Sequence, residues 1–129
     1  RPRKADAAVL KGSWGAQIID ELTPAQDEYV VHKQRFNAFY QTELELMLRC
    51  WHIDTLIVCG MITEVCVEST IREAFVRDFD VLEVRDAVGS WSQARHEASL
   101  QAVDFSYGRV TDTVSVLELL SRRKQALGL

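Results

Sequence analysis

The chain has 129 residues, of which 47% are hydrophobic and 26% charged, a composition typical of one soluble globular domain. This balance excludes intrinsic disorder, and the apolar run at residues 56–59 is far too short to cross a bilayer. Because 19 Asp and Glu outnumber 15 Lys and Arg, for a net charge of -4, we expect no nucleic acid and no membrane among the partners.

The first half of the chain predicts strands and helices in turn. A β-prone run at 28–33 predicts a strand, and a capping box followed by apolar residues at helical spacing predicts a helix at 42–51. Residues 55–60 are apolar without alternation, which is typical of a strand covered on both faces and hence of a parallel sheet. Thr63 is a good N-cap for a helix at roughly 64–77.

The second half continues this alternation. It predicts a strand at 81–84, a helix capped by Ser90 or Ser92, a short strand at 108–111 and a last helix capped by Thr111 or Asp112. Strands that alternate with helices throughout predict an α/β fold, with helices on both faces of a parallel sheet. Such a sheet binds its ligands at the carboxyl ends of its strands.

One cysteine falls at such a strand end. Cys66 lies in the first turn of a predicted helix, where unpaired backbone N–H groups and the helix dipole favour a thiolate and can hold an oxyanion. Glu64 and Glu68 nearby oppose a thiolate unless they point elsewhere. The alternative is a buried, inert cysteine packed among valines, which is common for free cysteines.

Lys33 ends the first predicted strand and is therefore expected at the same edge of the sheet. A lysine there stabilises a neighbouring thiolate, although a lone lysine at a strand end is more often simply solvated. Several aromatic side chains near strand ends are candidates for lining a pocket, with core packing as the equal alternative: Trp14, Phe36, Phe39 and Tyr40.

The other cysteines and three polar residues have simpler interpretations. Cys50 and Cys59 are expected in the core, and three cysteines without a Cys-x-x-Cys pair argue against disulfides and a zinc ribbon. We therefore expect no metal or other cofactor, and a reducing, cytoplasmic location. His52 and Asp78 stand where a helix C-terminus favours glycine, and Asp86 is expected to be a turn or cap residue.

Two of these segments match the motifs of a known family. Residues 60–74 read Gly-Met-Ile-Thr-Glu-Val-Cys-Val-Glu-Ser-Thr-Ile-Arg-Glu-Ala. This stretch resembles the nucleophile motif of the isochorismatase-like cysteine hydrolases, Gly-x-x-Thr-x-x-Cys-Val followed by Thr-x-Arg-x-Ala. Lys33 and the following Phe36-Asn37-Ala38-Phe39 resemble the lysine motif of that family. The resemblance implies one isochorismatase-like hydrolase domain over 1–129, with a three-layer α/β/α fold and a parallel sheet.

The resemblance also implies a reaction. The Cys66 thiolate would attack the carbonyl of a small amide, ureide or carbamoyl compound, and water would later release the acid from a thioester. Lys33 would hold the thiolate, and the backbone N–H groups of Ile62 and Cys66 would form the oxyanion hole beside a cis Met61–Ile62 peptide bond. Asn37 would join the aromatic residues in binding the substrate. The ureido or carbamoyl branch is the best match, and a homo-oligomer, either a dimer or a tetramer, is expected.

One part of the family pattern has no counterpart in these 129 residues. The family's general base is an aspartate at the end of a first strand, and no aspartate here stands in that motif. We therefore expect either an N-terminally incomplete domain or a degenerate member that serves as a non-catalytic binding or assembly module. An isochorismatase or nicotinamidase activity is a further alternative. A nucleotide-binding protein is disfavoured, because no phosphate-binding glycine-rich loop follows a strand.

Overall fold

The computed structural model describes residue 10 and residues 12–128. The chain divides into two compact units, Arg1–Val30 and Val31–Leu129. Within the described residues, no helix is both long and apolar enough to span a membrane. The predicted elements after residue 40 all belong to the second unit.

The described part of the first unit contains little regular structure. Its two short 3-10 turns, Trp14–Ala16 and Asp20–Leu22, leave their side chains exposed. The strand predicted at 28–33 is wrong, since these residues have no regular secondary structure and lie outside the sheet. A β-prone run becomes a strand only where a neighbouring strand pairs with it, and the local sequence does not reveal the neighbour.

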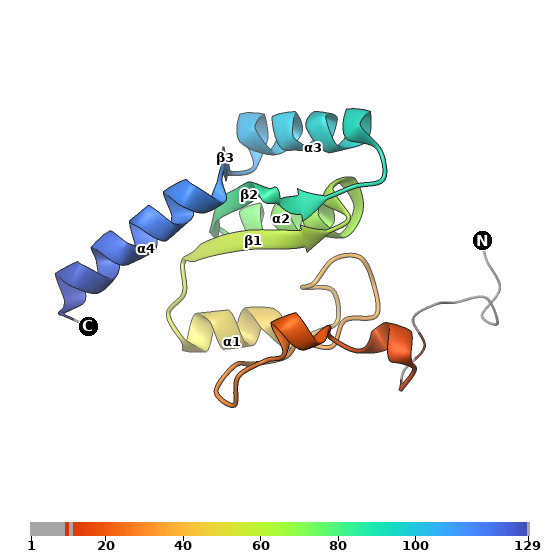
Figure 1. Cartoon of the computed structure of the whole chain (residues 1–129), viewed down its shortest axis with the longest axis horizontal. Coiled ribbons are helices and arrows are strands. Elements are labelled where there is room, and N and C mark those ends of the chain that lie inside the picture. Colours follow the sequence, from red (N-terminus) through yellow and green to blue (C-terminus); the bar gives the residue numbers. More distant parts are fainter. Residues whose placement is uncertain (1–9, 11, 129) are drawn as a thin grey trace. The chain divides into compact units, whose positions relative to one another are not determined.

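A parallel sheet of three strands organises the second unit (Figure 1). The strands lie in the order β1 (Thr55–Met61), β2 (Asp80–Gly89) and β3 (Arg109–Thr111). Pairing between β1 and β2 shifts register between Val58 and Gly60, close to the carboxyl end of β1. The predicted α/β fold with a parallel sheet is confirmed, and all three strands predicted after residue 50 are present.

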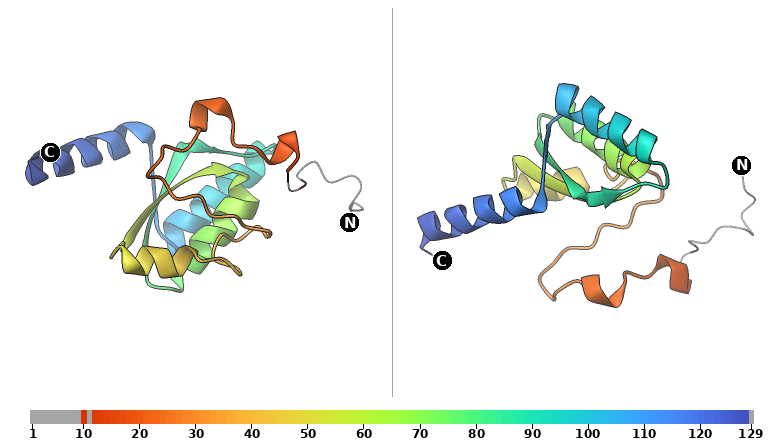
Figure 2. Two further views of the ribbon diagram at one scale, coloured as in Figure 1. Left: turned by 90° about the horizontal axis from the view of Figure 1, so that it is seen from below. Right: turned by 45° about the horizontal axis from the view of Figure 1, so that its top comes forward.

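Four helices surround this sheet: α1 (Leu44–Cys50), α2 (Glu68–Phe75), α3 (Gln93–Ser106) and α4 (Thr113–Leu127). Helices α2 and α3 connect consecutive strands and lie side by side on the sheet, as Figure 2 shows. Ser92 accepts a hydrogen bond from the Arg95 N–H, and Asp112 accepts one from the Ser115 N–H. Of the two candidates predicted for each helix start, Ser90 or Ser92 and Thr111 or Asp112, Ser92 and Asp112 are the caps.

The hydrophobic core lies between the sheet and helices α2 and α3. Ile71 and Ala74 of α2 and Val103 of α3 are fully buried, and Val81 of β2 packs with them. Burying isoleucine and valine side chains such as Ile71, Val81 and Val103 contributes about 1.5–3 kcal/mol each to the stability of the second unit.

The two cysteines expected in the core are both exposed, so that prediction is wrong. Leu56 and Val58 of β1 pack against the core, and strand alternation turns Cys59 to the opposite face of the sheet. Cys50 is the last residue of α1 and lies off its buried side, which is marked by Leu48. A continuous apolar run gives no sign of which strand face is covered, and this is why Cys59 was misplaced.

Two helices end on non-glycine residues with left-handed backbone, as predicted for His52 and Asp78, whose φ angles are 54° and 61°. After α2, the Phe79 N–H donates to the Ala74 carbonyl and the Asp78 N–H to the Phe75 carbonyl, which is the Schellman pattern. A side chain in this conformation costs on the order of 1 kcal/mol, which glycine avoids.

Replacing Asp78 by glycine should therefore stabilise the protein. The expected gain is about 0.5–1 kcal/mol in the free energy of unfolding, measured by urea denaturation. Asp80→Gly is the matched control, because Asp80 lies in extended β2, where glycine only adds chain entropy to the unfolded state. A loss of stability in Asp78→Gly as large as that in Asp80→Gly would refute the strain at residue 78.

Candidate active site

Cys66 lies in a single wide helical turn, Thr63–Val67, which follows β1 and leads directly into α2. We call this segment the Cys66 turn. The Ile62 carbonyl accepts hydrogen bonds from the Val65 N–H at 3.0 Å and from the Val67 N–H at 3.2 Å, and the amide of Cys66 lies between them. The peptide bond Met61–Ile62 just before the turn is cis, as the family resemblance predicts. Cys66 is half-buried and its thiol is free.

The first residue of the Cys66 turn is tied to α3 rather than to its own helix. Thr63 is fully buried, and its hydroxyl lies 3.0 Å from Nδ1 of His96. The Ser99 hydroxyl oxygen lies 3.4 Å from the Thr63 carbonyl oxygen. Thr63 was predicted to be a helix N-cap, and this is wrong, because Thr63 lies inside the turn, Ile62 is its N-cap, and the Thr63 hydroxyl contacts His96. It fixes the turn against α3 instead.

One hydroxyl group joins the Lys33 segment to the Cys66 turn. Thr70 of α2 donates to the Cys66 carbonyl at 2.7 Å and accepts from the Ala38 N–H at 3.1 Å. Ala38 lies five residues after Lys33, whose side chain is exposed and donates to the Arg35 carbonyl at 3.1 Å. The structure thus links the segments carrying the two predicted catalytic residues through a single side chain.

Replacing Thr70 by valine removes both of these hydrogen bonds while keeping the shape of the side chain. Since the Ala38 N–H is partly buried and loses its partner, the free energy of unfolding should fall by about 1–3 kcal/mol. Urea denaturation measures this loss, and Thr70→Ser, which keeps the hydroxyl, is the control. If the valine variant is as stable as the serine variant, the hydroxyl does not hold the two segments together.

The residues predicted to bind substrate occupy different surroundings. Phe36 and Tyr40 are exposed, at 63% and 52%, and their rings are open to a ligand. Phe39 is in the core, with its ring centroid 5.8 Å from that of Phe79. Asn37 is engaged within the protein, since it accepts from the Phe39 N–H at 2.8 Å and donates to Glu73 at 3.2 Å. Trp14 belongs to the first unit and is exposed.

The two glutamates beside Cys66 each have partners that hold them in place. Glu64 accepts a hydrogen bond from the Ser90 hydroxyl at 2.9 Å, and hydrogen bonds from its own backbone N–H and from Ser90 lower the pKa of its carboxyl. Glu68 forms an ion pair with Arg72 at 2.6 Å and accepts from the Ser99 hydroxyl at 2.5 Å. The cation of Arg72 thus offsets one of the two charges that oppose a Cys66 thiolate.

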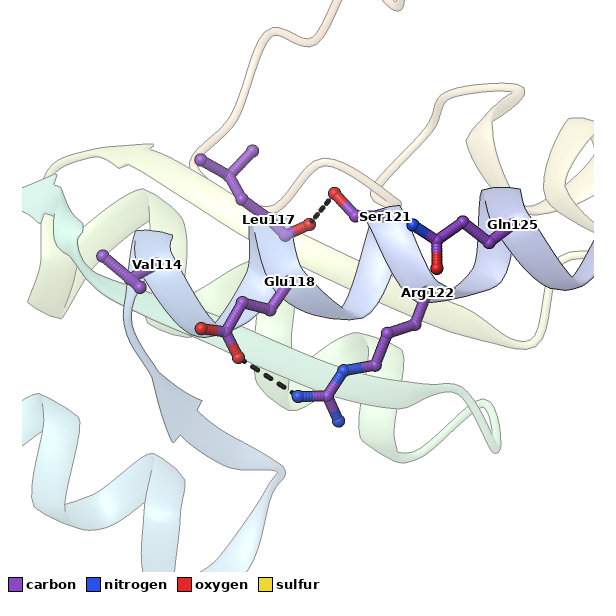
Figure 3. Close-up of a pocket in the computed structure, with 6 residues that line it drawn as sticks. All are labelled: Val114, Leu117, Glu118, Ser121, Arg122 and Gln125. Atoms are coloured by element: carbon purple, nitrogen blue, oxygen red, sulfur yellow. Dashed lines mark hydrogen bonds and ion pairs between the residues drawn. The ribbon is translucent and has the colours of Figure 1, made fainter.

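Three further candidates for a functional site are Asp86, a metal-binding cluster and a hollow on the surface of α4. Asp86, predicted to be a turn or cap residue, lies within β2 and not in a turn, and it accepts a hydrogen bond from the Thr113 N–H at the start of α4, whose N-cap is Asp112. Within the described residues, no group of three or more His, Cys, Asp or Glu side chains could hold a metal ion. A hollow of about 390 Å³ runs along α4, with a Glu118–Arg122 ion pair at 3.3 Å in its wall (Figure 3). Its lining comes from α4 alone and includes none of the predicted site residues.

Comparison with known families decides the classification of this chain. The model of the isochorismatase domain family matches residues 1–115. The chain belongs to the isochorismatase family. The match includes both the Lys33 segment and the Cys66 turn, the two motifs on which the resemblance was first based.

Named relatives of this isochorismatase-family chain are amidohydrolases. It is 34% identical over 122 residues to the ureidoacrylate amidohydrolase RutB of Methylorubrum extorquens, covering 94% of this chain and 49% of the relative. It is 32% identical over 126 residues to RutB of Acinetobacter baylyi, covering 97% of this chain and 51% of the relative. The chain therefore spans about half the length of the relatives it matches.

Solved structures of the family share the fold. An isochorismatase-like hydrolase from Alkaliphilus metalliredigens superposes with a TM-score of 0.81 at 33% identity, over 84% of this chain and 59% of that one. An N-carbamoylsarcosine amidase from Thermoplasma acidophilum superposes with a TM-score of 0.76 at 28% identity, over 84% of this chain and 61% of that one.

Sequence reasoning missed the residues that support the Cys66 turn. Thr70 was noted only as part of the family motif and His96 was given no role, although Thr70 follows Cys66 at the i+4 spacing at which a hydroxyl reaches a helical carbonyl. Glu83 carried a clearer signal, because a lone carboxylate interrupts the apolar run Val81-Leu82-Glu83-Val84. Such a residue in a buried strand needs a partner or a proton.

Proposed function

We propose that this protein is a cysteine-dependent hydrolase that cleaves a C–N bond of a small amide, ureide or carbamoyl compound. The observation that carries the proposal is the placement of Cys66 in the turn after β1, tied through Thr70 to the Lys33 segment. Membership of the isochorismatase family and amidohydrolases among the relatives support it.

In the proposed reaction, the Cys66 sulfur attacks the carbonyl carbon and the carbonyl electrons move onto oxygen. The C–N bond then breaks, and the nitrogen leaves with a proton as ammonia or an amine, which leaves a thioester on Cys66. Water attacks the thioester, so that the acid is released and the thiol is restored. One water is consumed for each C–N bond cleaved, and no redox partner is needed.

Lys33 and two backbone amides have supporting roles in this proposal. The Lys33 ammonium holds the thiolate and orients the reacting groups. The N–H groups of Ile62 and Cys66 stabilise the negative charge that develops on the carbonyl oxygen. The Ile62 carbonyl is held by the Val65 and Val67 amides, so the turn is well placed to keep these donors in a fixed orientation.

We further propose that the exposed rings of Phe36 and Tyr40 contact the substrate. The substrate-binding role of Trp14 stays a prediction from the sequence. Phe39 and Asn37, both held by internal contacts, would shape the site from beneath. Relatives named for ureidoacrylate and N-carbamoylsarcosine favour a ureido or carbamoyl substrate.

The free thiols fit a cytoplasmic location. Exposed apolar residues on α4, such as Leu117, fit a homo-oligomer.

A substrate panel tests the reaction in the intact protein. Ureidoacrylate and N-carbamoylsarcosine should release ammonia, with nicotinamide as the comparison amide. Acid quenching during turnover, followed by peptide mass spectrometry, should find an acyl group on the peptide that contains Cys66. An absence of turnover on every amide, together with an unmodified Cys66, would refute the proposal and favour a non-catalytic binding module.

A further inference from the structure

The centre of the sheet contains a carboxyl group that the proposed reaction does not use. Glu83 of β2 is fully buried, and its neighbours in register are Val58 on β1 and Val110 on β3. Within the part of the chain that the structure describes, neither of its carboxyl oxygens has a hydrogen-bond partner. A buried ionised carboxylate without partners is very costly, so this group calls for a physical explanation.

Glu83 lies two residues from Val81, so its side chain is on the face of β2 that packs against α2. Glu68, the first residue of α2, is the charged group on that helix that acts on Glu83. Glu68 Oε1 accepts from the Arg72 guanidinium at 2.6 and 2.8 Å, and Oε2 accepts from the Ser99 hydroxyl of α3. A carboxylate offers two lone pairs on each oxygen, so Glu68 can still accept from another donor. Glu83 becomes such a donor once it is protonated.

Among the described residues, Glu68 is the one charged group that shifts the pKa of Glu83. The polar side chain that the Cys66 turn buries is the uncharged Thr63, and α3 contributes the hydroxyl of Ser99. Burial first, and the negative charge of Glu68 second, raise the pKa of Glu83 to about 7. Both causes favour the neutral acid in the folded protein.

We propose that Glu83 is protonated in the folded protein and donates a hydrogen bond to the Glu68 carboxylate, so that this acid–carboxylate pair is a pH-sensitive element holding the start of α2 and the Cys66 turn against the sheet. Glu68 directly follows Val67, the last residue of that turn. When Glu83 loses its proton, two like charges face each other beneath the turn. Glu83 is thus a positioning residue, and this role does not depend on the reaction proposed for Cys66.

The sign of the pH dependence follows from the raised pKa. The pKa of Glu83 is about 7 in the folded protein, against an ordinary value of 4.5. Its contribution to stability is fully present below pH 4.5 and is lost as the pH rises towards 7. Relative to a variant without this titration, the folding equilibrium constant should fall on the order of a hundredfold across that window.

Urea denaturation at pH 4.5, 6 and 8 tests the proposal with three proteins: the native sequence, Glu83→Gln and Glu118→Gln. Glutamine keeps a donor for Glu68 without titrating, so Glu83→Gln should match the native protein at the lowest pH and exceed it at pH 8. Glu118, which is 61% exposed on α4, is the control and should follow the native protein at every pH. Parallel curves for the native protein and Glu83→Gln would overturn the proposal.

Infrared spectroscopy tests the proton directly and does not require the variant to fold. The native protein at pH 6 should show the C=O stretching band of a protonated carboxyl, and this band should disappear as the pH rises above 7. A native protein without this band at pH 6 would overturn the proposal. Neither readout requires enzymatic turnover, so a failure here is distinguishable from a failure of the proposed hydrolase function.

Discussion

Replacing Cys66 by alanine should abolish amide hydrolysis, with kcat falling by on the order of 10⁴-fold or more. The reason is that the proposed thioester forms on the Cys66 sulfur, and no other group of the Cys66 turn can form it. The thiol is half-buried, so alanine leaves the fold intact and the loss is confined to the chemistry. Steady-state ammonia release from a ureido or carbamoyl substrate measures the effect.

Cys59→Ala is the matched control for this variant. Cys59 is also a free cysteine, but it lies on the exposed face of β1, so its removal should leave the rate close to that of the native protein. If the Cys66→Ala variant kept full activity, Cys66 would not be the nucleophile. Equal losses in both variants would point to a general effect of removing thiols.

Replacing Lys33 by methionine should lower kcat by about 10²–10⁴-fold, the range typical of a group that assists proton transfer and holds charge in the transition state. Methionine preserves the length and much of the apolar stem of lysine but removes the ammonium that stabilises the thiolate. In the same variant, the rise of the Cys66 alkylation rate with pH should occur at a higher pH, because the thiolate loses its nearest proposed cation.

Lys124→Met controls for the loss of one positive charge, since Lys124 is exposed near the end of α4 and belongs to none of the proposed machinery. It should leave both kcat and the alkylation profile unchanged. A Lys33→Met variant that behaved like Lys124→Met would place Lys33 among ordinary solvated lysines. A solvated lysine at a strand end is the alternative that the sequence itself offers for Lys33.

The fold could be predicted wherever a local pattern carries the information. The apolar run at 55–60 predicted a strand of a parallel sheet, although β1 is not covered on both faces as expected. The cap candidates, Ser90 or Ser92 and Thr111 or Asp112, predicted where two helices begin. The exposure of Cys59 and the irregular backbone at 28–33 could not be predicted in this way. Both depend on which other segment lies alongside, and that information is not in the local sequence.

The candidate site shows the same division. Motif matching located Cys66 and Lys33 and predicted the cis Met61–Ile62 bond, because each of these belongs to a short stretch of sequence. The support beneath them is built from contacts between residues far apart in the chain, such as Thr70 with Ala38 and Thr63 with His96. Only the folded structure brings such pairs together.

The rate of thiol alkylation as a function of pH, resolved for each cysteine by peptide mass spectrometry in the intact protein, tests the central claim most directly. If Cys66 is an activated nucleophile, iodoacetamide should modify it rapidly in mildly acidic solution, where the more exposed Cys59 and Cys50 still react slowly. Modification of Cys66 that is slower than that of Cys59 and Cys50 at every pH, or absent, would contradict the claim and identify it as an inert structural cysteine.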